Sequence, residues 1–282
     1  MTEGLVDRLR CPGPLVTVEL RPPPSGLAAA EGMDAWIDRN HSIRNLALKD
    51  TFVFLTDDAV GSQEEENLGH LAANVGSDVP LSRLVPFLTC KHSIEYCLMF
   101  ADRARSLGFE ALTVVGGDTS LGPPRCVPHS YMLRQRIRER HPGLSLGGWA
   151  NPHRDVQRQV EYVGAADFTA DFYLTQVVSR HSVDRVEAFL EECDRRSVDV
   201  PGIFGVFYYW SANPGTLRQL GEFFPVPAEE LASEFEAGAT PEEVLRRTLD
   251  ALRAVGAEKV YISNLGHRRV RDRLAKVITP LS

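Results

Sequence analysis

The stretch Val114-Val115-Gly116-Gly117-Asp118 is an apolar run that ends at two glycines and a carboxylate. This pattern is typical of a buried strand that stops and presents an acid just beyond its end. A residue without a β-carbon lets the backbone approach a flat ligand closely, so the glycines favour a ligand site at this strand end. Several other apolar runs in the chain end in a similar way, which adds weight to this interpretation.

Short β-branched runs alternate with longer amphipathic runs along almost the entire chain. The predicted strands are Leu15–Leu20, Phe52–Thr56, Val85–Cys90, Leu112–Gly116, Leu144–Ala150, Phe172–Val178, Gly202–Tyr208 and Lys259–Ser263. The predicted helices between them include Ser93–Leu107, Tyr131–Arg140, Val183–Arg196 and Glu242–Val255. Apolar strands separated by helices indicate a parallel sheet. About eight such repeats favour a closed (β/α)8 barrel.

An open, doubly wound sheet is the main alternative fold. That fold usually carries a Gly-x-Gly-x-x-Gly turn after its first strand, whereas here Arg21-Pro22-Pro23-Pro24 follows. The Pro- and Gly-rich pieces of the chain are typical of strand-to-helix loops within one domain. We therefore expect residues 1–282 to form a single (β/α)8 TIM barrel, with a barrel core at about residues 15–278.

The bulk composition excludes several classes of protein. Of the 282 residues, 43% are hydrophobic and 24% are charged, which is enough for one large core. The formal net charge of −7 argues against nucleic-acid binding, which usually requires a basic surface. Five scattered cysteines without C-x-x-C spacing predict reduced thiols. No signal pattern or membrane-length apolar stretch is present, so we expect a cytoplasmic protein without membrane contact.

In such barrels the active site lies at the carboxyl ends of the strands. These ends are rich in acids, amides and aromatic residues: Glu19, Thr56-Asp57-Asp58, Thr89-Cys90-Lys91, Asp118, Trp149-Ala150-Asn151, Thr175-Gln176, Tyr208-Tyr209 and Ser263-Asn264. They lack the histidine cluster of a metal hydrolase and a Gly-x-Ser-x-Gly nucleophile turn, so no metal site is predicted. The set suits a flat, nitrogen-rich heterocycle that is protonated during a reaction.

These motifs, taken in order, resemble those of the methylenetetrahydrofolate reductase family. The similar segments are Val18-Glu19-Leu20-Arg21-Pro22-Pro23 for the opening strand, Gly117-Asp118 for an Arg-Gly-Asp strand end, Leu174-Thr175-Gln176 for a Thr-Gln strand end, Pro201-Gly202-Ile203-Phe204 with Thr216-Leu217-Arg218-Gln219-Leu220 for the seventh strand and its helix, and Tyr261 with Asn264 for the closing strand. The resemblance runs from about Leu15 to Gly266. Each motif is weak alone, but their ordered combination is fairly specific.

The resemblance implies a flavoprotein of one-carbon metabolism and methionine biosynthesis that reduces 5,10-methylenetetrahydrofolate to 5-methyltetrahydrofolate. NAD(P)H would supply the hydride through FAD. Glu19 would be the general acid that helps to open the imidazolidine ring to an iminium ion, and Asp118 would lie between flavin and folate. The other implied folate contacts are Gln176, Tyr208, Tyr209 and Asn264. The implied cofactor contacts are Thr56, Thr89, Gly117, Asp118, Asn151 and Arg158.

Several positions that serve FAD in the family are changed in this chain. Gly116 stands where the family has arginine, Phe87 where it has histidine, and Asn151-Pro152-His153-Arg154-Asp155 where it has two Pro-Glu motifs. Three alternatives stay open. The barrel binds FAD through altered contacts, passes hydride directly from NAD(P)H to folate, or binds folate without reducing it, as a partner or regulator of one-carbon enzymes. A homo-oligomer is also compatible with the sequence.

Plainer interpretations accompany some of these residues. Asp118 and Gln176 are also acceptable as ordinary strand-end residues, and Tyr208-Tyr209 as packing. We expect Asp57-Asp58 to be a solvated loop, and Lys91-His92 to be two polar residues ahead of a helix capped by Ser93. His153 and His181 are expected to be exposed to solvent.

Overall fold

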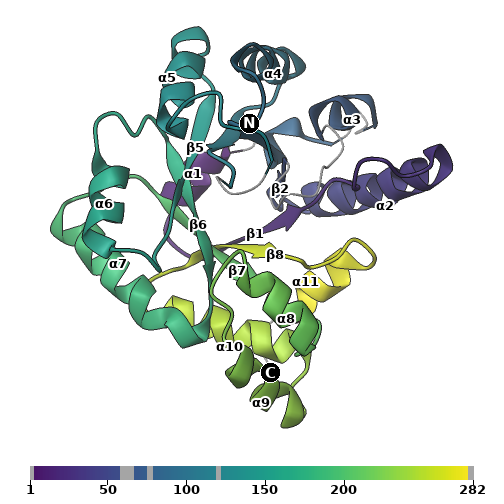
Figure 1. Ribbon diagram of the computed structural model, residues 1–282, viewed down its shortest axis with the longest axis vertical. Helices are drawn as coiled ribbons and strands as arrows, with labels where there is room; N and C mark the ends of the chain where they lie inside the picture. Colours follow the sequence, from purple (N-terminus) through teal and green to yellow (C-terminus); the bar gives the residue numbers. More distant parts are fainter. Residues whose placement is uncertain (1–2, 58–66, 75–78, 119–121, 279–282) are drawn as a thin grey trace.

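The computed structural model describes residues 3–57, 67–74, 79–118 and 122–278, and its eight strands close into a barrel (Figure 1). The strands are β1 (Leu15–Leu20), β2 (Val53–Leu55), β3 (Leu84–Thr89), β4 (Ala111–Val115), β5 (Ser145–Ala150), β6 (Phe172–Val178), β7 (Gly202–Phe207) and β8 (Lys259–Ser263). Each strand pairs in parallel with the next, and β8 pairs with β1. The predicted (β/α)8 barrel is confirmed.

Helices surround the barrel on its outside (Figure 1). They are α2 (Ala29–Ala47), α3 (Asn67–Asn74), α4 (Ile94–Leu107), α5 (Ser130–Arg140), α6 (Val156–Gly164), α7 (Val183–Arg195), α10 (Pro241–Ala254) and α11 (Val270–Ile278). The short helix α1 (Leu5–Arg10) packs Leu5 and Leu9 against the barrel interior. Helices α8 (Pro214–Gly221) and α9 (Ala228–Glu236) form an additional segment between β7 and α10, and the 3-10 turns are η1 (Leu81–Arg83) and η2 (Arg180–Ser182).

Local sequence signals explain several helix ends. Thr240 and Glu243 form the capping box that begins α10, because each side chain accepts a hydrogen bond from the other residue's backbone N–H. Ser93 caps α4 by accepting from the N–H of Tyr96 at 3.2 Å. Gly108 ends the same helix with a φ of 99°, a conformation that favours glycine.

Alternate residues of each strand point into the barrel, and aromatic rings fill its interior. Phe54 lies between Phe87 and Tyr261, with ring centroids 6.1 and 6.4 Å apart. On β1 the same alternation places Leu15 with this inner cluster and Val18 with the layer between strands and helices. Since Glu19 is four residues after Leu15, its side chain faces the interior at the carboxyl end of β1.

One buried arginine ties the β4 end to the neighbouring helices. Arg134 of α5 is fully buried and donates to the backbone oxygens of Val114 at 3.0 Å and Phe168 at 2.7 and 3.0 Å. Its guanidinium also lies over the ring of Phe168. These contacts satisfy backbone acceptors at the end of β4 and fix the strand that carries the Gly-Gly-Asp segment.

The α8–α9 segment has its own apolar cluster and an ionic anchor. Tyr209, Leu217, Leu231 and Val244 form the cluster. Glu234 of α9, which is 7% exposed, accepts from Arg180, His181 and Arg247 at 2.8 to 3.1 Å. The prediction that His181 is solvent-exposed is confirmed for the residue as a whole, although the ion pair leaves its side chain 20% exposed.

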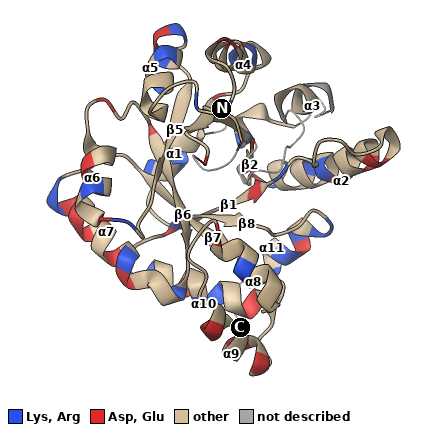
Figure 2. Cartoon of the chain, in the orientation of Figure 1, with Lys and Arg blue, Asp and Glu red and all other residues tan. Residues whose placement is uncertain are grey.

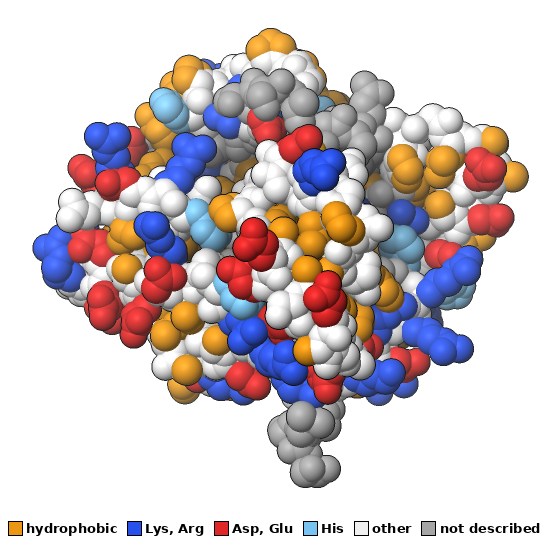
Figure 3. Space-filling view, turned by 60° about the horizontal axis from the view of Figure 1, so that its bottom comes forward, with side chains coloured by type: hydrophobic (Ala, Val, Ile, Leu, Met, Phe, Trp, Pro, Cys, Tyr) orange, Lys and Arg blue, Asp and Glu red, His pale blue; other side chains and the backbone are white. Residues whose placement is uncertain are grey.

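Charged side chains gather on the outer helices, while the strands are mostly uncharged (Figure 2). On the face shown in Figure 3, acidic and basic side chains are interspersed. No helix in the described part of the chain is long and apolar enough to cross a membrane.

Candidate functional site

A carboxylate lies at the carboxyl-end mouth of the barrel, held between β1 and β8. Glu19 is half-buried, and its Oε1 accepts a hydrogen bond from Ser263 Oγ at 2.6 Å. Beneath it, the fully buried Tyr261 donates its hydroxyl to the backbone oxygen of Thr175 at 2.7 Å. Burial, and then the nearby Glu19 carboxylate, raise the pKa of Tyr261 well above its ordinary value, so the phenol stays protonated. The Glu19 carboxyl group is therefore hydrogen-bonded by Ser263 and lies above the buried side chain of Tyr261.

Gln176 lies at an irregularity between β6 and β7, where the register shifts between Leu174 and Val177. Its Nε2 donates to the backbone oxygen of Phe223 at 3.1 Å, and its Oε1 accepts from the N–H of Val177 at 2.9 Å. These two bonds fix which end of the amide is which. Because Phe223 follows α8, the α8–α9 segment orients Gln176.

The β2 and β3 ends are joined by an aspartate and a histidine. Asp57 accepts from the N–H of Thr89 at 2.7 Å, from Thr89 Oγ1 at 3.1 Å and interacts with His92 Nε2 at 2.9 Å. Its side chain is only 16% exposed. The prediction of a solvated loop is wrong for Asp57, because Thr89, at the end of the adjacent strand, donates hydrogen bonds to its carboxylate. Asp58 lies outside the described residues. Tyr96 packs on the His92 ring at 4.5 Å.

The Gly116-Gly117 segment after β4 is covered by two cationic side chains from other parts of the fold. A β-carbon on Gly116 would lie 2.6 Å from Cζ of Arg125, and one on Gly117 would lie 2.8 Å from Cγ of Lys91. Arg125 donates to the backbone oxygen of Gly117, and Lys91 Nζ donates to that of Pro123 at 2.9 Å. The close approach allowed by the glycines is thus used by the chain's own side chains. Asp118 follows, half-buried.

The remaining predicted cofactor contacts are buried, hydrogen-bonded within the fold, or exposed on a helix. Thr56 is buried. The Oδ1 of Asn151 accepts from the N–H of His153 at 3.0 Å, and its own N–H donates to Gln159 at 2.8 Å. Arg158 is exposed in the first turn of α6. The predicted exposure of His153 is wrong, since its Nε2 bonds the backbone oxygen of Val177 at 2.7 Å.

The predicted aromatic folate contacts pack within the protein. Tyr208 is 1% exposed and belongs to the layer between strands and helices, where its hydroxyl interacts with Glu242. Burial raises the pKa of Tyr208 to about 12. Tyr209 is 5% exposed within the α8–α9 cluster. Asn264 is exposed and donates to the backbone oxygen of Tyr208 at 2.9 Å. Their ligand contacts stay predictions.

The flavin side of the predicted site does not fit a bound FAD in the family manner. Arg125 and Lys91 fill the space above the two glycines, and Thr89 and Asn151 hold their polar atoms in internal hydrogen bonds. On the side predicted to bind folate, Glu19 and Gln176 are oriented at strand ends by hydrogen bonds. Sequence reasoning places Ser263 and Lys91 at strand ends without their partners, and it expects His92 only as a polar residue ahead of a helix. Arg125 is missed, because its position in the loop after β4 carries no signal in the sequence.

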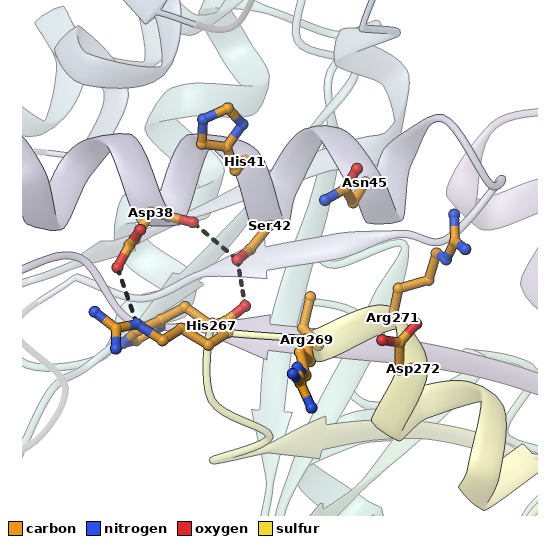
Figure 4. Close-up of a pocket in the computed structure, with 10 residues that line it drawn as sticks. Asp38, His41, Ser42, Asn45, His267, Arg269, Arg271 and Asp272 are labelled. Atoms are coloured by element: carbon orange, nitrogen blue, oxygen red, sulfur yellow. Dashed lines mark hydrogen bonds and ion pairs between the residues drawn. The ribbon is translucent and has the colours of Figure 1, made fainter.

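A separate cavity of about 240 Å³ lies between α2 and the start of α11 (Figure 4). Ser42 Oγ bridges this gap by donating to the backbone oxygen of His267 at 2.7 Å. Burial, and then the charge of Arg39, lower the pKa of His267 below its ordinary 6.5. The guanidinium groups of Arg269 and Arg271 point in different directions in Figure 4, so they do not converge on one ligand position.

Comparisons with known proteins find the same barrel fold in solved structures. No family model matches the sequence, and no curated protein matches it. Among solved structures, an uncharacterized protein from Clostridium thermocellum that binds two copies of 5-methyl-5,6,7,8-tetrahydrofolic acid is 15% identical over 94% of both chains, with a TM-score of 0.66. An F420-dependent secondary alcohol dehydrogenase, in complex with an F420-acetone adduct, is 12% identical over 95% of this chain and 100% of that chain, with a TM-score of 0.54. At these identities the likeness shows the barrel fold.

Proposed function

We propose that this barrel binds a reduced folate at its mouth and reduces 5,10-methylenetetrahydrofolate to 5-methyltetrahydrofolate with NAD(P)H. The observation that carries the proposal is the Glu19 carboxyl group, which faces the barrel interior at the end of β1 and is oriented by Ser263 at 2.6 Å. A carboxyl group at a strand end, held in one orientation by a neighbouring hydroxyl, is placed to exchange a proton with a ligand bound at the mouth.

The two structural neighbours support this choice over other barrel functions. One binds a 5-methyl folate, the product of the proposed reaction, and the other is a redox enzyme of a deazaflavin. Both share nearly the full length of the barrel with this chain. Folate binding and hydride chemistry are thus both represented on this fold.

The proposed reaction balances over a ring opening, a hydride addition and the return of a proton to Glu19. Glu19 delivers a proton to the ring nitrogen that leaves the bridging carbon, the carbon–nitrogen bond breaks, and an iminium ion forms at the other nitrogen. A hydride from the nicotinamide adds to the iminium carbon and gives the methyl group, while NAD(P)H becomes NAD(P)⁺. Water then returns a proton to Glu19.

Gln176 and Asp118 are proposed to orient the pterin. The bonds to Phe223 and Val177 occupy one donor and one acceptor position of the Gln176 amide. An amide has two donor hydrogens and two acceptor lone pairs, so one donor and one acceptor of Gln176 remain for the edge of a pterin. Asp118, at the end of β4, is proposed to accept from the pterin's ring nitrogens or amino group.

The residues around the end of β4 favour direct hydride transfer from NAD(P)H to the folate. The residues there do not fit FAD in the family manner, so no step of the proposal passes through a flavin. The alternative is a folate-binding barrel without reductase activity, which acts as a partner or regulator in one-carbon metabolism. It rests on the same observation, that Arg125 and Lys91 fill the space above Gly116 and Gly117, because a barrel that has lost its cofactor site can keep its ligand site.

Three measurements on the purified full chain separate these versions. Titration calorimetry with 5-methyltetrahydrofolate tests folate binding, and oxidation of NADH or NADPH with methylenetetrahydrofolate tests turnover. The absorbance at about 450 nm, recorded with and without added FAD, tests whether a flavin is bound. We expect a colourless protein that binds folate and turns over. Binding without turnover would support the non-catalytic alternative, and no binding of either folate would overturn the proposal.

A further inference from the structure

Phe207, the last residue of β7, lies at the barrel mouth beside the Glu19–Ser263 pair. Strand alternation sets its direction. A β-carbon on Gly205 would lie 2.5 Å from Cζ of the buried Tyr261, so position 205 faces the barrel interior, and Phe207, two residues later, faces the same way. In the parallel pairing of β7 with β8, Phe207 is the direct partner of Ser263. The ring therefore projects beside the hydroxyl that donates to Glu19 at 2.6 Å.

Four neighbouring strands each bring one side chain to this part of the mouth. In barrel order they are the carboxyl group of Glu19 on β1, the hydroxyl of Ser263 on β8, the ring of Phe207 on β7 and the amide of Gln176 on β6. All four residues are half-buried, so each reaches solvent above the buried interior. Neighbouring strands lie about 4.8 Å apart, so the arc from the acid to the amide spans about 14 Å. A flat ring system that reaches from Glu19 toward Gln176 therefore passes the ring of Phe207.

Two further aromatic rings pack against Phe207 and limit its movement. Its ring centroid lies 5.0 Å from that of Tyr209 and 5.3 Å from that of Phe224, with interplanar angles of 54° and 45°. Tyr209 is itself buried. Phe224 follows Phe223, whose backbone oxygen accepts from Gln176 Nε2 at 3.1 Å. The turn after α8 therefore supports the Phe207 ring and orients the neighbouring amide at the same time.

We propose that Phe207 is a specificity-determining residue, which stacks on the pterin ring of the bound reduced folate. This inference rests on the proposed function and names the residue that recognises the flat part of the substrate. Stacking on an aromatic side chain attracts a heterocycle through its face, while Glu19 and Gln176 offer hydrogen bonds at its edges. Phe207 covers one face of the pterin, which leaves the opposite face to the nicotinamide that delivers the hydride.

Titration calorimetry of the full chain with 5-methyltetrahydrofolate tests the contact. Phe207→Leu should raise the Kd about tenfold, equivalent to about 1.4 kcal/mol, whereas Phe207→Tyr retains the ring and should recover most of the affinity. The matched control is Phe235→Leu, because Phe235 packs in the same apolar cluster and is also half-buried, but lies on α9. This control should bind as wild type does, and the thermal midpoints of the two leucine variants show whether both fold.

Nuclear Overhauser effects identify which ring of the ligand contacts Phe207. In protein that carries protonated phenylalanine in a deuterated background, we expect effects between the Phe207 ring protons and the N5-methyl protons of 5-methyltetrahydrofolate. These effects should be absent in Phe207→Leu, which assigns them. Effects to the aminobenzoyl protons alone, or none to Phe207, would overturn the assignment to the pterin.

The outcomes separate this inference from the function on which it rests. If wild type binds 5-methyltetrahydrofolate and the Kd of Phe207→Leu is unchanged, the stacking contact is overturned while the folate site stands. An equal loss of affinity in Phe235→Leu would likewise overturn it, because the effect would then belong to the apolar cluster. Wild type that binds no folate would overturn the proposed function and the stacking contact together.

Discussion

The two sides of the barrel mouth differ in how they use their strand ends. On the β1–β8 side, Glu19 faces the mouth and is oriented by Ser263 above the buried Tyr261. On the β3–β4 side, the space offered by Gly116 and Gly117 is filled by Arg125 and Lys91 from neighbouring loops. One side presents a reactive group, and the other is closed by the protein itself.

Under the proposed function, this difference would let a folate site persist where a flavin site has been lost. A general acid requires one side chain and one or two hydrogen-bond partners, all from strands whose positions the barrel fixes. A dinucleotide site requires empty, preshaped space, and a single long side chain can fill it. The proposed folate side should therefore tolerate changes in loops, whereas a flavin site on the β3–β4 side would not.

The largest expected effect is on the acid side. Glu19→Gln should lower turnover by ~10²-fold or more, because the amide cannot protonate the folate. Folate affinity and the thermal midpoint should change little. The matched control is Glu258→Gln, whose carboxyl lies ahead of β8 at the opposite end of the barrel. Turnover of Glu19→Gln equal to that of wild type would remove Glu19 from the mechanism.

The next effect concerns the orientation of that acid. Ser263→Ala removes the 2.6 Å hydrogen bond to Glu19. A hydrogen bond to a charged group is worth about 1.5 kcal/mol, so kcat should fall about tenfold. Because the carboxyl group itself remains, Ser263→Thr, which retains a hydroxyl, should recover most of the loss. A kcat unchanged in the alanine variant would show that the bond does not position the acid.

On the closed side, Gly116→Ala should displace Arg125 at a small cost in stability. The added β-carbon meets only the far end of a flexible side chain, so we expect a loss of about 1 kcal/mol in the free energy of unfolding. Gly147→Ala is the contrasting control, because its β-carbon would lie 2.6 Å from the Phe172 ring inside the barrel, and should cost about 3 kcal/mol. Urea denaturation measures both.

The double variant Gly116→Ala/Arg125→Ala isolates the contact. If Arg125 is what occupies the space, the double variant should be no less stable than Arg125→Ala alone, a non-additive result. Strictly additive losses would contradict the filled-space interpretation. Binding of added FAD by Arg125→Ala but not by wild type would show that the Arg125 side chain is what excludes the flavin.

The smallest effect lies outside both sides, at His267 beside the α2–α11 cavity. Burial, and then Arg39, lower the pKa of His267 in the folded state, whereas in the unfolded chain it is near 6.5. The unfolded state therefore binds more protons, and the stability that His267 contributes is present above about pH 6.5 and lost as the pH falls. Between pH 7.5 and 5.5, His267→Gln should lose less stability than wild type in urea denaturation, and the exposed control His129→Gln should follow wild type.

Much of the fold follows from local pattern. All eight strands were predictable to within one residue at each end, and the Thr240 capping box and the Gly108 helix end were predictable as well, because periodicity and capping depend on neighbouring residues. Within the candidate site, strand alternation predicts that Glu19 faces inward. It does not predict that Tyr208 and Tyr209 pack among helices, since that depends on where α8, α9 and α10 dock.

The sequence by itself determined the barrel, the order of its strands and the acid at the end of β1. Short-range backbone preferences and the spacing of apolar residues specify these features. Only the tertiary structure decided that Ser263 meets Glu19, that Asp57 bonds Thr89 and His92, and that Arg125 occupies the space above Gly116. The reason is physical: barrel closure and loop packing bring together residues tens to hundreds of positions apart, and no local pattern encodes which of them will touch.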